Sequence, residues 1–244
     1  MEVKSNYIYD IEKSANRIQE ILDSDNSNYE EKDNNIPSRE SLTYTNGYYV
    51  NLTALFIDIV GSSDLGEGTK RPVLAKIYRS FISECIAIIS SCTKCKEVNI
   101  NGDCVWGVFE TPLQTDIDMV FNIACKLNSF IMLLNKKLLK KGYQTIKVGI
   151  GLDYGRALMI KAGYKGSTIN DVVWMGDVVN NACHFANKAG RDNLDPIVVS
   201  SCVHTNLNED NKSLLDGYFD WEQQCTHYQG DVVYSDMKEW INNN

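Results

Sequence analysis

The sequence predicts an α+β or α/β sandwich, in which helices cover one face of a mixed sheet. The run LTALFIDIV, at 52–60, suits a central strand because it is apolar, rich in strand-forming residues and interrupted by a single acid. Asn101-Gly102 stands between two short strand-like runs and is the strongest short signal of a hairpin. Apolar residues at helical spacing follow Pro72 and fill residues 112–141, which predicts two long helices.

The rest of the chain continues the alternation of strands and helices. Residues 145–162 predict a second hairpin that turns at Asp153–Gly155. A short strand, a helix and three further strands are expected at 171–174, 176–188, 197–201, 217–222 and 230–235. This order of elements is typical of a layered α/β arrangement, but by itself it does not single out a function.

The N-terminal part of the chain differs in pattern from the rest. Apolar residues spaced by three and four predict a helix within residues 1–23. Residues 24–46 are polar and predict a flexible linker. The main domain is then expected at 47–244. The helix presents too narrow an apolar stripe to fold alone, so we expect it to dock on the domain or on a partner chain.

The composition excludes some classes of function. The 244 residues carry a formal net charge of -8, which argues against a general nucleic-acid binder but not against a protein that binds one nucleotide. The first residues lack the apolar core of a signal peptide, and no apolar run approaches the ~18 residues needed to span a bilayer. We therefore expect a cytoplasmic protein that binds no membrane.

Two acids carry the first sign of chemistry. Asp58 interrupts an apolar strand, where an unpaired carboxylate would cost several kcal/mol, so it needs either a basic partner or a metal ion. Asp103 follows Asn101-Gly102 at a hairpin tip, where an acid is more often part of an ordinary turn. A hairpin beside the first strand would bring both carboxylates together, and a cation between them would relieve their repulsion. Mg²⁺ favours such sparse ligation with phosphate oxygens and water.

Small residues and an arginine indicate a phosphate site. Gly61, Ser62 and Ser63 directly follow the first strand, where backbone N–H groups can approach phosphate oxygens, although this is also ordinary loop composition. Arg156 could add a forked contact to phosphate, or it could be a solvated turn residue.

Four segments resemble those of class III nucleotidyl cyclases, in the same order along the chain. They are LFIDIVGSSDL at 55–65, INGDCVWGVF at 100–109, VGIGLDYGRALMIKAG at 148–163 and VVWMGDVVNNA at 172–182. The full set of segments, with residues 161–180 included, especially resembles the bacterial pyrimidine cyclases of the Pycsar antiphage system. The resemblance implies the ferredoxin-like catalytic domain of that family, with a mixed, mainly antiparallel sheet and helices.

The resemblance also implies roles for residues at matching positions. Two divalent ions, Mn²⁺ or Mg²⁺, would bind a nucleoside triphosphate in a head-to-tail homodimer whose active sites draw on both chains, with Asn180 contributed by the partner subunit. The expected residues are, for the metals, Asp58, Asp103 and the Ile59 carbonyl; for phosphate, Gly61, Ser62, Ser63 and Arg156; and for catalysis, Asn180 and Arg156.

The positions that recognise the base depart from the purine patterns of the family. The position that is usually Lys in adenylate cyclases and Glu in guanylate cyclases is Asn99, and a position that is commonly Asp in adenylate cyclases is Val173. Tyr49 could narrow the pocket for a pyrimidine, or it could be a strand-edge aromatic. His184 replaces an arginine that many cyclases have four residues after the catalytic asparagine.

These departures imply a pyrimidine substrate. We expect UTP to give cyclic UMP, a second messenger in antiphage defence that acts on a separate effector. A cytidylate cyclase is the first alternative, followed by a purine cyclase or a non-catalytic nucleotide-binding sensor.

Overall fold

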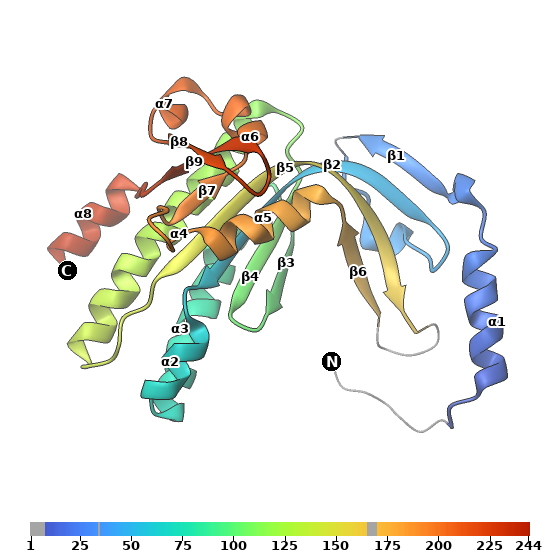
Figure 1. Cartoon of the computed structure of the whole chain (residues 1–244), viewed down its shortest axis with the longest axis horizontal. Coiled ribbons are helices and arrows are strands. Elements are labelled where there is room, and N and C mark those ends of the chain that lie inside the picture. Colours follow the sequence, from blue (N-terminus) through green and yellow to red (C-terminus); the bar gives the residue numbers. More distant parts are fainter. Residues whose placement is uncertain (1–7, 34, 165–169) are drawn as a thin grey trace.

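One mixed sheet forms the centre of the chain (Figure 1). The computed structural model describes residues 8–33, 35–164 and 170–244. In that part the strand order is β3-β4-β2-β5-β7-β9-β8, with β1 beside β2 and β6 beside β5. Only β1–β2 and β5–β7 are parallel among these pairs. The strands are β1 Tyr29–Asp33, β2 Gly47–Ile59, β3 Cys95–Asn101, β4 Cys104–Phe109, β5 Val148–Gly163, β6 Asn170–Met175, β7 Ile197–Val199, β8 Asp216–Asp220 and β9 Cys225–Gly230.

Helices cover both faces of this sheet, whereas the sequence predicted one. Helices α3 and α4 pack on the face where Leu55 and Ile57 of β2 point, and α5 packs on the opposite face against residues such as Leu52 and Ala54. The reason lies in β2, whose apolar side chains alternate between both faces and therefore need cover on each. The helices are α1 Ile11–Leu22, α2 Ser62–Gly68, α3 Arg71–Ser90, α4 Gln114–Lys140, α5 Asp177–Lys188, α6 Ser201–Asn206, α7 Glu209–Lys212 and α8 Ser235–Asn243, with 3₁₀ turns at Asn26–Asn28 and Arg39–Ser41.

The longest helix, α4, is a core helix of the domain. Its 27 residues include a segment that is long and apolar enough to cross a membrane. However, 67% of that segment is buried against the rest of the protein. Its apolar side chains face α3 and the sheet, which accounts for its composition.

Strand β5 is one uninterrupted strand of 16 residues, which corrects the hairpin predicted at Asp153–Gly155. Tyr154 and Gly155 stay paired with β2. The neighbouring glycines serve the helix above the strand: a Cβ at Gly151 would lie 2.1 Å from the carbonyl oxygen of Ala182 in α5. Glycine here marks a close approach of backbones rather than a turn.

The segment predicted as a flexible linker, 24–46, contains regular structure. Strand β1 lies within it and pairs in parallel with the start of β2. Its sequence, YEEKD, shows no apolar alternation because β1 lies on an edge of the sheet, where charged side chains are common. The structure therefore joins this segment to the main domain.

An arm projects from the body of the domain (Figure 1). It consists of β1, the start of β2, the end of β5 and β6, or residues 29–33, 47–51, 156–163 and 170–175. The predicted N-terminal helix forms as α1 and lies beyond the arm, with none of its residues buried. Residues 1–7 of the predicted helix lie outside the described part.

Candidate active site

Asp58 and Asp103 lie together at one end of the sheet, as the sequence predicted. Asp58 is next to last in β2, on the face covered by α5, and its side chain is 17% exposed. Asp103 lies in the tight β3–β4 turn, where Gly102 has a φ of 64° that favours glycine. Burial raises the pKa of Asp58, and the charge of Asp103 raises it further. The two carboxylates therefore repel each other in a partly desolvated space.

A divalent cation suits this pair of acids. Oδ2 of Asp103 is buried and finds no hydrogen-bond partner among the described residues, which is costly for a carboxylate. Among all the residues that the structure describes, no group of three or more His, Cys, Asp or Glu side chains could hold a metal ion. Two carboxylates fit Mg²⁺ or Mn²⁺ whose other ligands are phosphate oxygens and water. The predicted third donor, the carbonyl of Ile59, belongs to the last residue of β2.

Arg191 contacts Asp58, and sequence reasoning did not identify this contact. Its Nη2 lies 3.5 Å from Oδ2 of Asp58, and its charge opposes the rise in the pKa of that acid. Its Nη1 donates to the carbonyl of Asn187 at 2.6 Å, near the end of α5. A basic residue just after a helix usually satisfies the last carbonyls, so its position gave no sign of the contact with Asp58.

The loop after β2 lies beside the two acids. Gly61 has a φ of 66° and precedes α2, Ser62 is half-buried and Ser63 is exposed. The N–H of Val60 donates to the carbonyl of Lys147 at 2.9 Å, which places an exposed lysine next to this loop. This backbone contact ties the start of the loop to the residue that precedes β5.

Tyr78 of α3 also borders the two acids. Burial raises its pKa, the charges of Asp103 and Asp58 raise it further, and a hydrogen bond with Ser62 opposes this rise. The phenol therefore links the loop to the acids. Sequence reasoning did not single out Tyr78.

Arg156 lies away from these residues within one chain. It pairs with Asn51, seven positions from Asp58 along β2, and the alternation of side chains puts it on the opposite face of the sheet. In the arm it forms an ion pair with Glu31, and its guanidinium lies 3.7 Å from the ring centroid of Tyr49. The structure thus brings Arg156 to Tyr49 rather than to Asp58.

The three predicted base-binding residues lie in two places. Tyr49 and Val173 share one face of the arm, on the two strands that flank β5. Asn99 lies on β3, opposite Trp106, whose ring stacks on Phe56 with 4.9 Å between centroids. Since Phe56 and Asp58 point to the same side of β2, Asn99 shares the sheet face of the acids.

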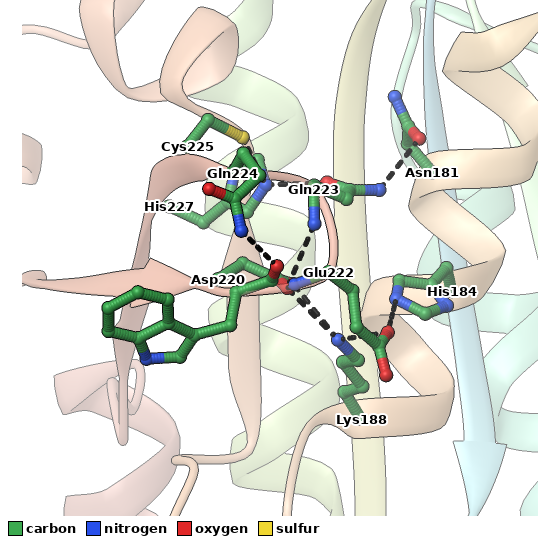
Figure 2. Close-up of polar contacts among 10 residues, drawn as sticks. Asn181, His184, Lys188, Asp220, Glu222, Gln223, Gln224, Cys225 and His227 are labelled. Atoms are coloured by element: carbon green, nitrogen blue, oxygen red, sulfur yellow. Dashed lines mark hydrogen bonds and ion pairs between the residues drawn. The ribbon is translucent and has the colours of Figure 1, made fainter.

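A polar network holds α5 to the sheet (Figure 2). Asn181 donates to buried Asp153 of β5 at 3.0 Å and accepts from Gln223, in the β8–β9 turn, at 3.1 Å. Nε2 of buried His227 lies 2.6 Å from Oε1 of Gln223, and burial lowers the pKa of His227. The neutral ring therefore donates to the Gln223 oxygen.

The same turn also holds the later part of α5 (Figure 2). Lys188 pairs with Asp220 at 3.0 Å and with Glu222 at 2.8 Å. His184 lies 3.5 Å from Glu222. His184, which stands where many cyclases have an arginine, thus points toward the β8–β9 turn.

One chain does not place Asn180 directly beside the acids. The neighbouring Asn181 meets Asp153, which is four residues along β5 from Gly149, the partner of Asp58. At 3.3 Å per residue this separation is roughly 13 Å. Asn180 is exposed in the first turn of α5, where a second chain can reach it.

The fold and the paired acids define a nucleotidyl cyclase domain. The chain belongs to the family of the adenylate and guanylate cyclase catalytic domain, whose model matches residues 45–223. It is similar to a uridylate cyclase of Treponema porcinum, with 38% identity over 234 residues that cover 96% of this chain and 81% of the relative. It is also similar to a uridylate cyclase of Gulbenkiania mobilis, with 43% identity over 191 residues, or 75% of this chain and 73% of the relative.

Solved structures share the fold. The adenylyl cyclase CyaB from P. aeruginosa matches with a TM-score of 0.63 at 18% identity. The match covers 75% of this chain and 94% of the CyaB chain. A class III adenylyl cyclase-like ATP-binding protein from Pseudomonas aeruginosa matches with a TM-score of 0.68 at 17% identity. This match covers 93% of this chain and 49% of the chain of that protein. These likenesses confirm the predicted class III cyclase fold, and at such identities they support the fold alone.

Proposed function

We propose that the protein converts UTP to 3′,5′-cyclic UMP and diphosphate. The observation that carries this proposal is the pair Asp58 and Asp103, with an orphaned buried carboxylate oxygen, at the end of the central strand. The two relatives named uridylate cyclase support the choice of UTP. Asn99 and Val173, which match neither purine pattern, favour a pyrimidine substrate without distinguishing UTP from CTP.

In this proposal each residue acts on the triphosphate or the ribose. Asp58, Asp103 and the Ile59 carbonyl would hold two divalent ions, and such ions would supply Lewis-acid activation of the 3′-hydroxyl and neutralisation of charge on the diphosphate. Gly61, Ser62 and Ser63 hold phosphate oxygens.

The remaining residues complete the site from a second chain. Asn180 orients the ribose and the reacting phosphate, and Arg156 and Tyr49 approach the nucleotide from the arm of the partner. The separation of Asn180 and Arg156 from Asp58 within one chain supports a homodimer with shared sites.

Mixing two inactive variants tests the shared site. Asp58→Ala and Asn180→Ala should each be inactive alone, and a mixture should regain up to about a quarter of the wild-type activity, because random pairing forms one intact site in half of the dimers. A mixture as inactive as its components, with dimers verified by light scattering, would contradict a shared site.

The substrate is tested directly. The purified protein is incubated with UTP, CTP, ATP or GTP and Mn²⁺, and cyclic products are measured by mass spectrometry. We expect cyclic UMP above all, then cyclic CMP. A strong preference for ATP or GTP would overturn the pyrimidine substrate.

A non-catalytic nucleotide-binding sensor is the second candidate. His184 stands where many cyclases have arginine, and it lies 3.5 Å from Glu222. Metal-dependent nucleotide binding without any cyclic product, in calorimetry and turnover assays on one preparation, would establish this function instead.

We further propose a cytoplasmic role in which cyclic UMP is a second messenger of antiphage defence and binds a separate effector. This role predicts that phage infection raises cyclic UMP in cells that express the protein. Unchanged cyclic UMP in infected, protected cells would overturn it.

A further inference from the structure

Asn99 is held by a buried acid on the same strand. Its Nδ2 donates to Oε1 of Glu97 at 2.8 Å, and Glu97 is 9% exposed. An ionised carboxylate accepts hydrogen bonds and cannot donate one, so the amide nitrogen must face Glu97 and the amide oxygen must face away. The amide of Asn99 therefore presents its acceptor and its remaining N–H in a fixed order.

The negative charge of Glu97 has no evident role in stabilising the fold. Among the described residues, no ion pair to Glu97 is found, and the nearby Lys94 and Lys96 pair with Asp116 and Glu110. A buried carboxylate without a cation is costly, and a neutral side chain would suit this position at least as well. The acid therefore points to a role beyond stability.

The surroundings of Asn99 suit a planar base. Trp106, directly opposite on β4, is half-buried and stacks on Phe56, on the face that carries Asp58. The half-buried Asn99 sets a polar amide edge next to this flat aromatic surface. A heterocycle that meets such an edge is distinguished by the order of its donors and acceptors.

We propose that Glu97 is a positioning residue for the choice of base: it fixes the amide of Asn99 so that the site takes uracil and rejects cytosine. This inference rests on the proposed function. Uracil presents an N3–H donor beside the O4 acceptor, whereas cytosine presents an N3 acceptor beside the N4 donor. An amide that turns by 180° can satisfy either base, but an amide held by a carboxylate satisfies only one.

The isosteric variant Glu97→Gln tests this role. A glutamine amide can donate or accept, so Asn99 is released to turn while the packing is kept. The ratio of kcat/KM for UTP to that for CTP should fall by about tenfold or more, the scale set by leaving one buried polar group unpaired. The control is Glu110→Gln, which alters another half-buried carboxylate of the same sheet region and should leave the ratio unchanged.

Asn99→Leu is the second variant, in case Glu97→Gln does not fold. It removes the amide and keeps Glu97, and the ratio should fall as well. A ratio unchanged in both folded variants, or a wild-type preference for CTP, would overturn the inference while cyclase activity stands. Wild-type protein that makes no cyclic pyrimidine nucleotide would instead overturn the proposed function.

Discussion

Arg191 and Asp58 form an ion pair, with Nη2 3.5 Å from Oδ2, at the place proposed for a divalent ion. The guanidinium competes with such an ion for the carboxylate. We expect Arg191→Gln to bind Mn²⁺ more tightly by a factor of a few, since partly exposed pairs contribute only about 0.2–1 kcal/mol. Calorimetry without nucleotide measures this, with exposed Arg79→Gln as the control. Weaker Mn²⁺ binding by folded Arg191→Gln would show that the arginine supports the metal site.

The two acids should be essential for turnover but not for folding. Asp58→Asn and Asp103→Asn should each lose about 10³-fold or more in kcat/KM, the scale of a major electrostatic contribution. Mn²⁺ should no longer raise the melting temperature of either variant, because the folded state gains nothing from the ion. Exposed Asp210→Asn is the control. Full turnover with unchanged metal dependence in either variant would defeat the mechanism.

The contact between β5 and α5 should tolerate no added methyl group at Gly151. A Cβ there would lie 2.1 Å from the carbonyl oxygen of Ala182, so Gly151→Ala should cost about 3 kcal/mol or more. At Gly155 the nearest atom, in Val178, is 3.5 Å away, which is an ordinary contact. Urea unfolding should therefore show a much smaller loss in Gly155→Ala, and equal losses would contradict the close packing of α5.

Gln223 should influence catalysis through the placement of α5. It joins Asn181 to His227 across the β8–β9 turn. We expect Gln223→Ala to lower kcat by about tenfold, since small displacements of a reacting group are costly, with little change in KM. The matched control is Gln224→Ala, whose side chain donates to the carbonyl of Trp221 within the turn. Equal kcat values in the two variants would exclude this role.

Burial of His227 should make the folded state sensitive to acid. Its pKa lies below the usual 6.5 because burial disfavours the charged ring, and Lys188 and His184 act in the same direction while Asp220 opposes them. Below pH 6.5 the unfolded chain takes up a proton that the folded chain resists, so stability present above that pH is lost as the pH falls. The free energy of unfolding, measured from pH 7.5 to 5.5, should decline less steeply in His227→Gln. An identical decline would assign the acid sensitivity to other groups.

The sequence predicted what depends on local chemistry. Asp58 in an apolar strand and Asp103 after Asn101-Gly102 gave the paired acids, because strand and hairpin signals are local and the carboxylates repel without a cation. It did not predict the contact of Arg191 with Asp58, which depends on how the end of α5 meets β2.

Two predictions, the hairpin within β5 and the flexible linker that contains β1, were wrong for the same reason: strand pairing is not visible in local sequence. Asp153-Tyr154-Gly155 has the composition of a turn, but β2 is long enough to keep it paired, so Arg156 falls on the other face of the sheet. The charged strand β1 is held by backbone pairing with β2, which side-chain patterns do not record. Local propensity yielded to pairing with a long neighbour in both cases.

Because β5 runs without a break for 16 residues, about 50 Å at 3.3 Å per residue, its two ends share one register. Deleting or inserting one residue in its middle would turn every side chain beyond that point to the other face. If Val148 and Ile150 kept their orientation, Arg156 and Leu158, which share one face of the arm, would both turn to its opposite face. A change of one residue in the length of this strand therefore needs a β-bulge to keep the faces of the arm fixed relative to the geometry around Asp58.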